Sequence, residues 1–87
     1  MASRADEASG RIRIGLVGGG TGGSALLDVL LDWPAVNVAV VVDPRAEAPG
    51  LGKAKGLGIP PASHHLEVFA YPVDLVLEVT GQPPVLE

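Results

Sequence analysis

Five of the six residues at positions 18–23 are glycine, and this run (GGGTGG) separates two segments of different character. Residues 12–17 form a short apolar run typical of a buried strand, whereas residues 24–33 repeat apolar side chains at helical spacing. A nearly side-chain-free turn lets the backbone come very close to a neighbouring segment or a ligand. The sequence therefore predicts a strand, a tight glycine turn and a helix in direct succession.

The rest of the chain continues the alternation of strand and helix patterns. Residues 36–42 (VNVAVVV) are mostly valine, as expected of a strand that is covered on both faces. Residues 59–63 form a short strand at a sheet edge, because Pro60 and Pro61 cannot donate to a ladder. Further elements are predicted as a strand at 73–79 and as helices at 49–58, at 65–70 and from Pro83 onward. This alternation indicates an α/β fold of the Rossmann type, with about four parallel strands in the order 3-2-1-4 and helices on both faces.

The apolar spacing also predicts which side chains face the sheet. The inward set consists of Leu26, Val29, Leu30 and Trp33 in the first helix, Leu51, Ala54 and Leu57 in the second, and Leu66 and Phe69 in the third. The solvent-facing set consists of Asp28, Asp32, Lys53 and Lys55.

A chain of 87 residues and 8.8 kDa is one small domain at most. We expect residues 1–10 to be a disordered polar tail and residues 11–87 to be a partial dinucleotide-binding domain. The fourth strand would be an apolar edge, and such an edge favours pairing with another strand. The chain is therefore interpreted as a truncated fragment that adjoins further domains of its parent protein, or as a homodimer paired through that edge.

The glycines fit the spacing Gly18-x-Gly20-x-x-Gly23 of a dinucleotide-binding turn. In this motif the first glycine allows the tight turn, the second lets a pyrophosphate approach the backbone, and the third lets the helix lie close to the sheet. The amino end of the following helix then faces the phosphates. Thr21 is expected to cap this helix or to contribute a hydroxyl contact.

Asp43 ends the second predicted strand, 20 positions after Gly23, where a carboxylate would accept hydrogen bonds from the adenosine ribose. Because a carboxylate repels a 2′-phosphate, NAD is favoured over NADP. Arg45 either offsets this repulsion by covering a phosphate or is a solvated loop arginine. The candidate cofactor-binding residues are Gly18, Gly19, Gly20, Thr21, Gly22, Gly23, Asp43, Pro44, Arg45, Thr80 and Gly81.

Composition argues against several other functions. The net charge of −4, without a cluster of basic residues, and the aromatic content of 3% disfavour nucleic-acid binding. The sequence has no cysteine and no apolar run long enough to span a bilayer, so thiolate metal sites and a membrane partner are not expected. His64 and His65 are expected to point apart on a surface loop or at a helix start rather than to bind metal. We expect a cytoplasmic protein.

Two other nucleotide-binding folds were weighed. Methyltransferases generally carry an acidic residue just before their glycines, where this chain has Leu16 and Val17. A P-loop is excluded because no Gly-Lys-Ser/Thr follows the glycines. Glu78, in an otherwise apolar strand, is expected to be a buried carboxylate with a structural hydrogen bond rather than a general base.

The segments IGLVGGGTGG, VVVD and DLVLEVTG resemble the N-terminal Rossmann domains of homoserine, aspartate and glyceraldehyde-3-phosphate dehydrogenases, from about residue 11 to residue 81. The segment APGLGKAKGLGIP is similar to nucleotide-binding segments that precede PAS and histidine-kinase domains in bacterial signalling proteins. The resemblance implies NAD binding by Gly18, Gly20, Gly23 and Asp43, with Thr80 and Gly81 on the far side. It implies no catalytic residue in this chain. Three roles follow as hypotheses: the cofactor-binding part of an oxidoreductase, a non-catalytic nucleotide or redox sensor, or a scaffold for dimerisation.

Overall fold

The computed structural model describes residues 10–79, which form one four-stranded sheet. Its strands are β1 (Ile12–Val17), β2 (Val36–Val42), β3 (Pro61–Ala62) and β4 (Leu75–Glu78). All three pairings are parallel and the order is β3-β2-β1-β4, which confirms the predicted topology. The proline-containing strand β3 lies at one edge, as expected. β4 lies at the other edge, and its pairing with a further strand stays a prediction. The helix predicted from Pro83 lies outside the described residues.

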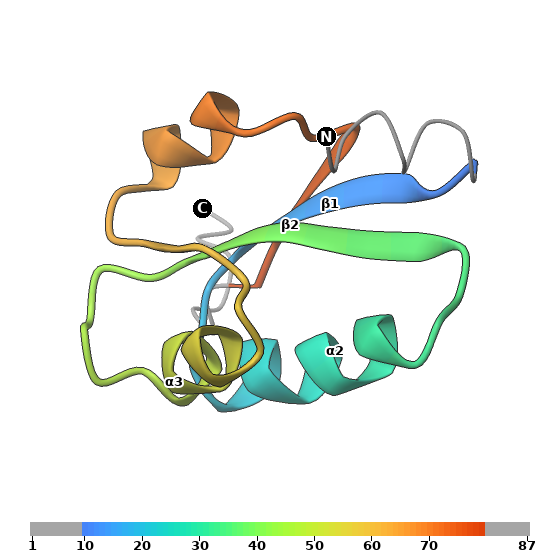
Figure 1. Cartoon of the computed structure of the whole chain (residues 1–87). Helices are drawn as coiled ribbons and strands as arrows, with labels where there is room; N and C mark the ends of the chain where they lie inside the picture. The colour runs from blue at the N-terminus through green and yellow to red at the C-terminus, as the bar shows by residue number, and fades with distance from the viewer. Residues whose placement is uncertain (1–9, 80–87) are drawn as a thin grey trace, which may run out of the picture.

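Helices cover both faces of this sheet, which confirms the second part of the fold prediction. The α-helices α2 (Thr21–Leu31) and α3 (Pro49–Gly56) lie side by side on one face, and the 3-10 helix η1 (His65–Ala70) lies on the other (Figure 1). α2 begins at Thr21, directly on the glycine turn, rather than at Ser24. No helix within residues 10–79 is both long and apolar enough to cross a bilayer.

The core has two parts, one on each face of the sheet. Under α2 and α3, the buried cluster includes Ile14 and Leu16 of β1, Val41 of β2 and Leu51 of α3. On the η1 face, a smaller cluster joins Val40 and Val42 to Val68. β2 therefore buries consecutive valines on opposite faces, which explains its nearly continuous apolar sequence.

The predicted inward stripe of α2 is wrong in part. Val29 and Trp33 are exposed, Trp33 to 53%, and the buried residues of the helix are Gly23, Leu27 and Leu30. The phase of α2 is fixed by the close packing of Gly23 against Gly18, and residues four and seven positions later then lie on the same face. A packing contact at the glycine turn thus decides which of several leucines and valines is buried.

The inward residues of the other two helices also differ from the prediction. In η1, Leu66 and Phe69 are exposed, Phe69 to 70%, and Val68 is buried instead. The start of η1 is set by His64, whose Nδ1 accepts the Leu66 N–H at 3.2 Å. In α3, Leu51 and Ala54 are buried as expected, whereas Leu57 lies past the helix end and is exposed.

Ion pairs join elements that are distant in sequence. Lys53 is not simply a solvated side chain, because its Nζ lies 2.8 Å from Asp28 Oδ1 and donates to the Ser24 carbonyl at 3.2 Å, which ties α3 to α2. At the amino end of the sheet, the Arg13 Nη2 and Nε atoms donate to Asp74 at 3.0 and 3.1 Å. This contact holds β1 against the start of β4.

We predict that Gly15→Ala destabilises the domain by about 1–3 kcal/mol, a cost typical of overpacking a core. A Cβ at this position of β1 would overlap the Val68 side chain of η1. Chemical denaturation of the single variants and of the double variant with Val68→Ala measures the coupling. The double variant should be more stable than the sum of the two single effects implies. Strict additivity would show that the two residues are not in contact.

Candidate functional site

The glycine turn lies at the carboxyl edge of the sheet, between β1 and α2 (Figure 1). Gly18 has a φ of 111°, a conformation that favours glycine, and its N–H donates to the Val42 carbonyl at 2.7 Å. A Cβ on Gly23 would overlap the Gly18 carbonyl oxygen. Two glycines of the predicted motif are therefore required by the turn itself.

Asp43 anchors this turn to the end of β2. Its side chain is only 3% exposed, and its Oδ2 accepts the Gly19 N–H at 2.7 Å. Oδ1 accepts the Arg45 backbone N–H at 2.8 Å, and the Arg45 Nε and Nη2 atoms donate to the two oxygens at 3.0 Å each. Hydrogen bonds from the Arg45 side chain, opposed by burial and assisted by the two backbone donors, lower the pKa of Asp43 to about 2.

The amino end of α3 closes on the opposite side of the turn. The Gly50 N–H donates to the Gly19 carbonyl at 2.6 Å, and a Cβ on Gly50 would lie 2.9 Å from both the Gly19 Cα and its oxygen. Sequence analysis missed this role of Gly50. The only signal for it is a glycine directly after Pro49 at the start of a helix, where it lowers helix propensity without an evident reason.

Gly20 stands at the N-cap of α2, and no side chain caps this helix. Thr21 is therefore not the cap, because it is itself the first residue of the helix. Its side chain is exposed in the first turn. A Cβ on Gly20 would lie 2.9 Å from Arg45 Nη2, so the guanidinium faces the amino end of α2. Backbone N–H groups and one cation thus face the same space, which suits an anionic group.

Two cavities flank this edge. One of about 280 Å³ lies beside Asp43, and residues of the β2 and β3 ends, α3 and η1 line it, among them Pro44, Leu51, Lys55, Ala62 and Glu67. Another of about 330 Å³ lies across the ends of β1, β2 and β4, and Pro44 and Glu78 are among its lining residues. Glu78 is exposed, so the expectation of a buried carboxylate there is wrong: it is near the end of an edge strand.

The histidine pair differs from expectation in the orientation of its rings. The rings of His64 and His65 do not point apart but stack, with centroids 4.6 Å apart. Within residues 10–79, no group of three or more histidine, cysteine, aspartate or glutamate side chains is arranged to hold a metal ion. His64 is the N-cap of η1, which confirms the expected helix start.

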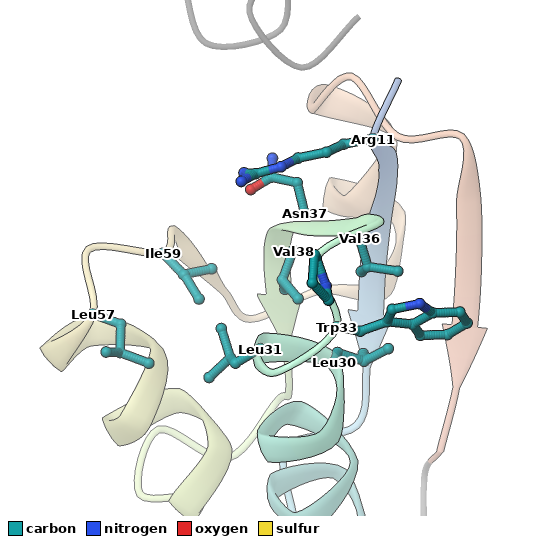
Figure 2. Close-up of a pocket in the computed structure, with 10 residues that line it drawn as sticks. Arg11, Leu30, Leu31, Trp33, Val36, Asn37, Val38, Leu57 and Ile59 are labelled. Carbon is teal, nitrogen blue, oxygen red and sulfur yellow. The ribbon is translucent and has the colours of Figure 1, made fainter. Parts of the chain in front are cut away.

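A third cavity, of about 290 Å³, lies at the other end of the sheet. Its lining includes Leu30, Trp33, Val36 and Ile59, and Arg11 and Asn37 lie side by side at its rim (Figure 2). Most of the residues that line this cavity are apolar, but Arg11 and Asn37 also belong to its lining. It lies at the amino ends of the strands, so it is separate from the glycine turn.

The structure brings nine of the eleven candidate residues together at one edge: Gly18, Gly19, Gly20, Thr21, Gly22, Gly23, Asp43, Pro44 and Arg45. Thr80 and Gly81 lie outside the described residues. No protein-family model matches the chain, and no curated protein matches its sequence.

We predict that Gly23→Ala disrupts the turn and destabilises the domain by more than 1 kcal/mol, because the added methyl group meets rigid backbone. Gly52→Ala is the matched control, since a Cβ there meets nothing within 4 Å and alanine favours the helix by about 1 kcal/mol. Thermal unfolding should shift in opposite directions for the two variants. Equal effects would contradict the close approach of Gly23 to Gly18.

We also predict a pH dependence of stability that Asp43→Asn reduces. Because the pKa of Asp43 is lowered from 3.8 to about 2, ionisation of this carboxyl stabilises the folded state by about 2 kcal/mol above pH 4. This contribution is lost as the pH falls from about 4 to about 2. Denaturation midpoints measured over this range should fall more steeply for the wild type than for the variant. Parallel curves would show that Asp43 is not held by its partners.

Proposed function

We propose that this domain binds NAD(H) as the cofactor-binding part of a larger oxidoreductase. The observation that supports the proposal most is the position of the glycine turn at the topological switch point. The chain leaves β1 for a neighbour on one side, β2, whereas β4 pairs on the other side. In open parallel sheets, ligands bind at the carboxyl ends of the strands at such a point.

The turn has the features that a diphosphate requires. Gly18 and Gly23 allow α2 to start directly against the sheet, and Gly20 leaves the backbone at its N-cap uncovered by a side chain of its own. The amino end of a helix attracts negative charge, and α2 has no acidic residue in its first turn to oppose this attraction. Residues 18–23 would therefore hold the diphosphate through backbone N–H groups.

Asp43 would hold the adenosine ribose, because its buried carboxylate lies next to the turn and stays ionised at neutral pH. The adjoining cavity of about 280 Å³, with Pro44, Leu51 and Ala62 in its lining, offers apolar surface for the adenine ring. The dinucleotide, when bound, supplies the hydride chemistry. The residues of this chain bind it and orient it.

The same binding would serve a non-catalytic nucleotide or redox sensor, the alternative role. The two roles differ in what the bound dinucleotide does. In an oxidoreductase, hydride transfer to a substrate converts NADH to NAD, whereas in a sensor the nucleotide stays unchanged while it shifts the equilibrium of attached domains.

Titration with NADH and NADPH, followed by fluorescence and calorimetry, tests the proposed function. The wild type should bind NADH more tightly than NADPH. Asp43→Asn should weaken NADH by about tenfold, since it removes a charged acceptor, and should reduce the preference for NADH over NADPH. Asp74→Asn is the matched control, because Asp74 is also an arginine-bound carboxylate but lies at the amino end of the sheet.

The proposed function is wrong if the folded wild type binds neither nucleotide at millimolar concentration. Circular dichroism of each variant establishes that the fold is intact. A variant at Asp43 that binds both nucleotides as the wild type does would remove Asp43 from the site.

A further inference from the structure

Arg45 makes two contacts, each with a residue assigned to a different part of the dinucleotide. Its guanidinium is bonded to Asp43, the residue assigned to the ribose, and the same Nη2 atom lies over Gly20, the residue assigned to the diphosphate. From the sequence, Arg45 is either a phosphate-covering residue or a solvated loop arginine. The side chain is 56% exposed and yet held by two hydrogen bonds, so it is accessible but ordered by Asp43.

The position of the guanidinium separates two possible phosphate contacts. A role in binding a ribose 2′-phosphate would need the guanidinium on the far side of Asp43, away from the turn. Instead Nη2 lies 2.9 Å from the point where a Cβ of Gly20 would stand, and Gly20 is the N-cap of α2. The cation therefore lies where the diphosphate would approach the backbone.

The hydrogen bonds of Asp43 show that Arg45 occupies acceptor positions that ribose hydroxyls would need. Oδ1 accepts from the Arg45 backbone N–H and Nε, and Oδ2 accepts from the Gly19 N–H and Arg45 Nη2. Two of these four donors belong to the main chain and stay in place. The other two belong to the exposed guanidinium, so the carboxylate gains room for ribose hydroxyls only when Arg45 turns away.

Resting on the proposed function, we propose that Arg45 is a diphosphate-binding residue that exchanges partners when the ligand binds. Its guanidinium passes from the Asp43 carboxylate to the diphosphate, and the carboxylate then accepts the ribose hydroxyls. The exchange replaces a contact with one negative charge by a contact with a group of higher charge, and it breaks no backbone hydrogen bond.

This exchange defines the ligand class. A nucleoside without phosphate must compete with Arg45 for Asp43 and offers the guanidinium nothing in return. A nucleotide with a 5′-diphosphate provides the new partner. Once Arg45 has turned away, Asp43 carries an uncompensated negative charge that repels a 2′-phosphate. The site therefore selects nucleoside 5′-diphosphates with an unmodified ribose 2′-hydroxyl.

Calorimetric titration of Arg45→Met and Arg45→Lys with ADP, adenosine, NADH and NADPH tests the exchange. Arg45→Met should weaken ADP and NADH by about 10- to 100-fold, the effect of a charge-assisted hydrogen bond, while adenosine binds as well as or better than to the wild type. Arg45→Lys, which keeps the charge but loses the forked geometry, should lie between them.

Arg13→Met is the matched control. It removes an arginine that is bonded to an aspartate through the same two types of nitrogen atom, and it changes the net charge equally, at the opposite end of the sheet. It should leave all four affinities unchanged. Thermal unfolding of each variant confirms that the protein titrated is folded.

Three results would overturn the inference, and they differ from one another. If Arg45→Met weakens NADPH alone and leaves ADP unchanged, Arg45 binds a 2′-phosphate instead. If wild-type NADH binding is present but both Arg45 variants bind every ligand normally, the exchange is wrong and the proposed function stands. If the wild type binds neither NADH nor ADP, the proposed function fails together with the inference.

Discussion

The hydrogen bond from the Gly19 N–H to the buried Asp43 carboxylate is the contact on which the geometry of the candidate site depends. It fixes the glycine turn to the end of β2, at the edge where parallel strands present their carboxyl ends. On the other side of the turn, Gly50 of α3 donates to the Gly19 carbonyl. The turn is thus held by one residue from a strand and one from a helix, and α2 begins from a fixed point.

The fold could be predicted from the sequence because its main signals come from burial on both faces of a sheet. Residues 36–42 are mostly valine, since β2 lies between β1 and β3 and packs under helices on either side. Pro60 and Pro61 restricted the third strand to an edge, and the structure places it there. The position of the candidate site could also be predicted, because the strand-turn-helix order around the glycines is a local sequence pattern.

Side-chain roles that depend on tertiary packing could not be predicted in this way. Helical spacing predicted an inward stripe that includes Val29, whereas the contact between Gly23 and Gly18 selects the rotation of α2 that buries Leu27. Gly50 looked like a weak point in a helix, because its neighbour Gly19 lies 31 positions earlier in the sequence. Arg45 was ambiguous since an exposed loop arginine and an ordered one have the same sequence signature.

A chain with a net charge of −4 repels anions as a whole, so an anion site on it needs local positive charge. Within residues 10–79, Asp43 is the only acidic side chain that is bonded to the turn, and Arg45 balances its charge. What remains is the partial positive charge of the uncapped α2 amino end. In the proposed site, attraction for an anion would therefore come first from the backbone, because the charges of the Asp43–Arg45 ion pair cancel each other. Such a pair adds no net charge to the site. In the proposed exchange, its guanidinium would bind the phosphate groups of a ligand and its carboxylate would bind the hydroxyl groups.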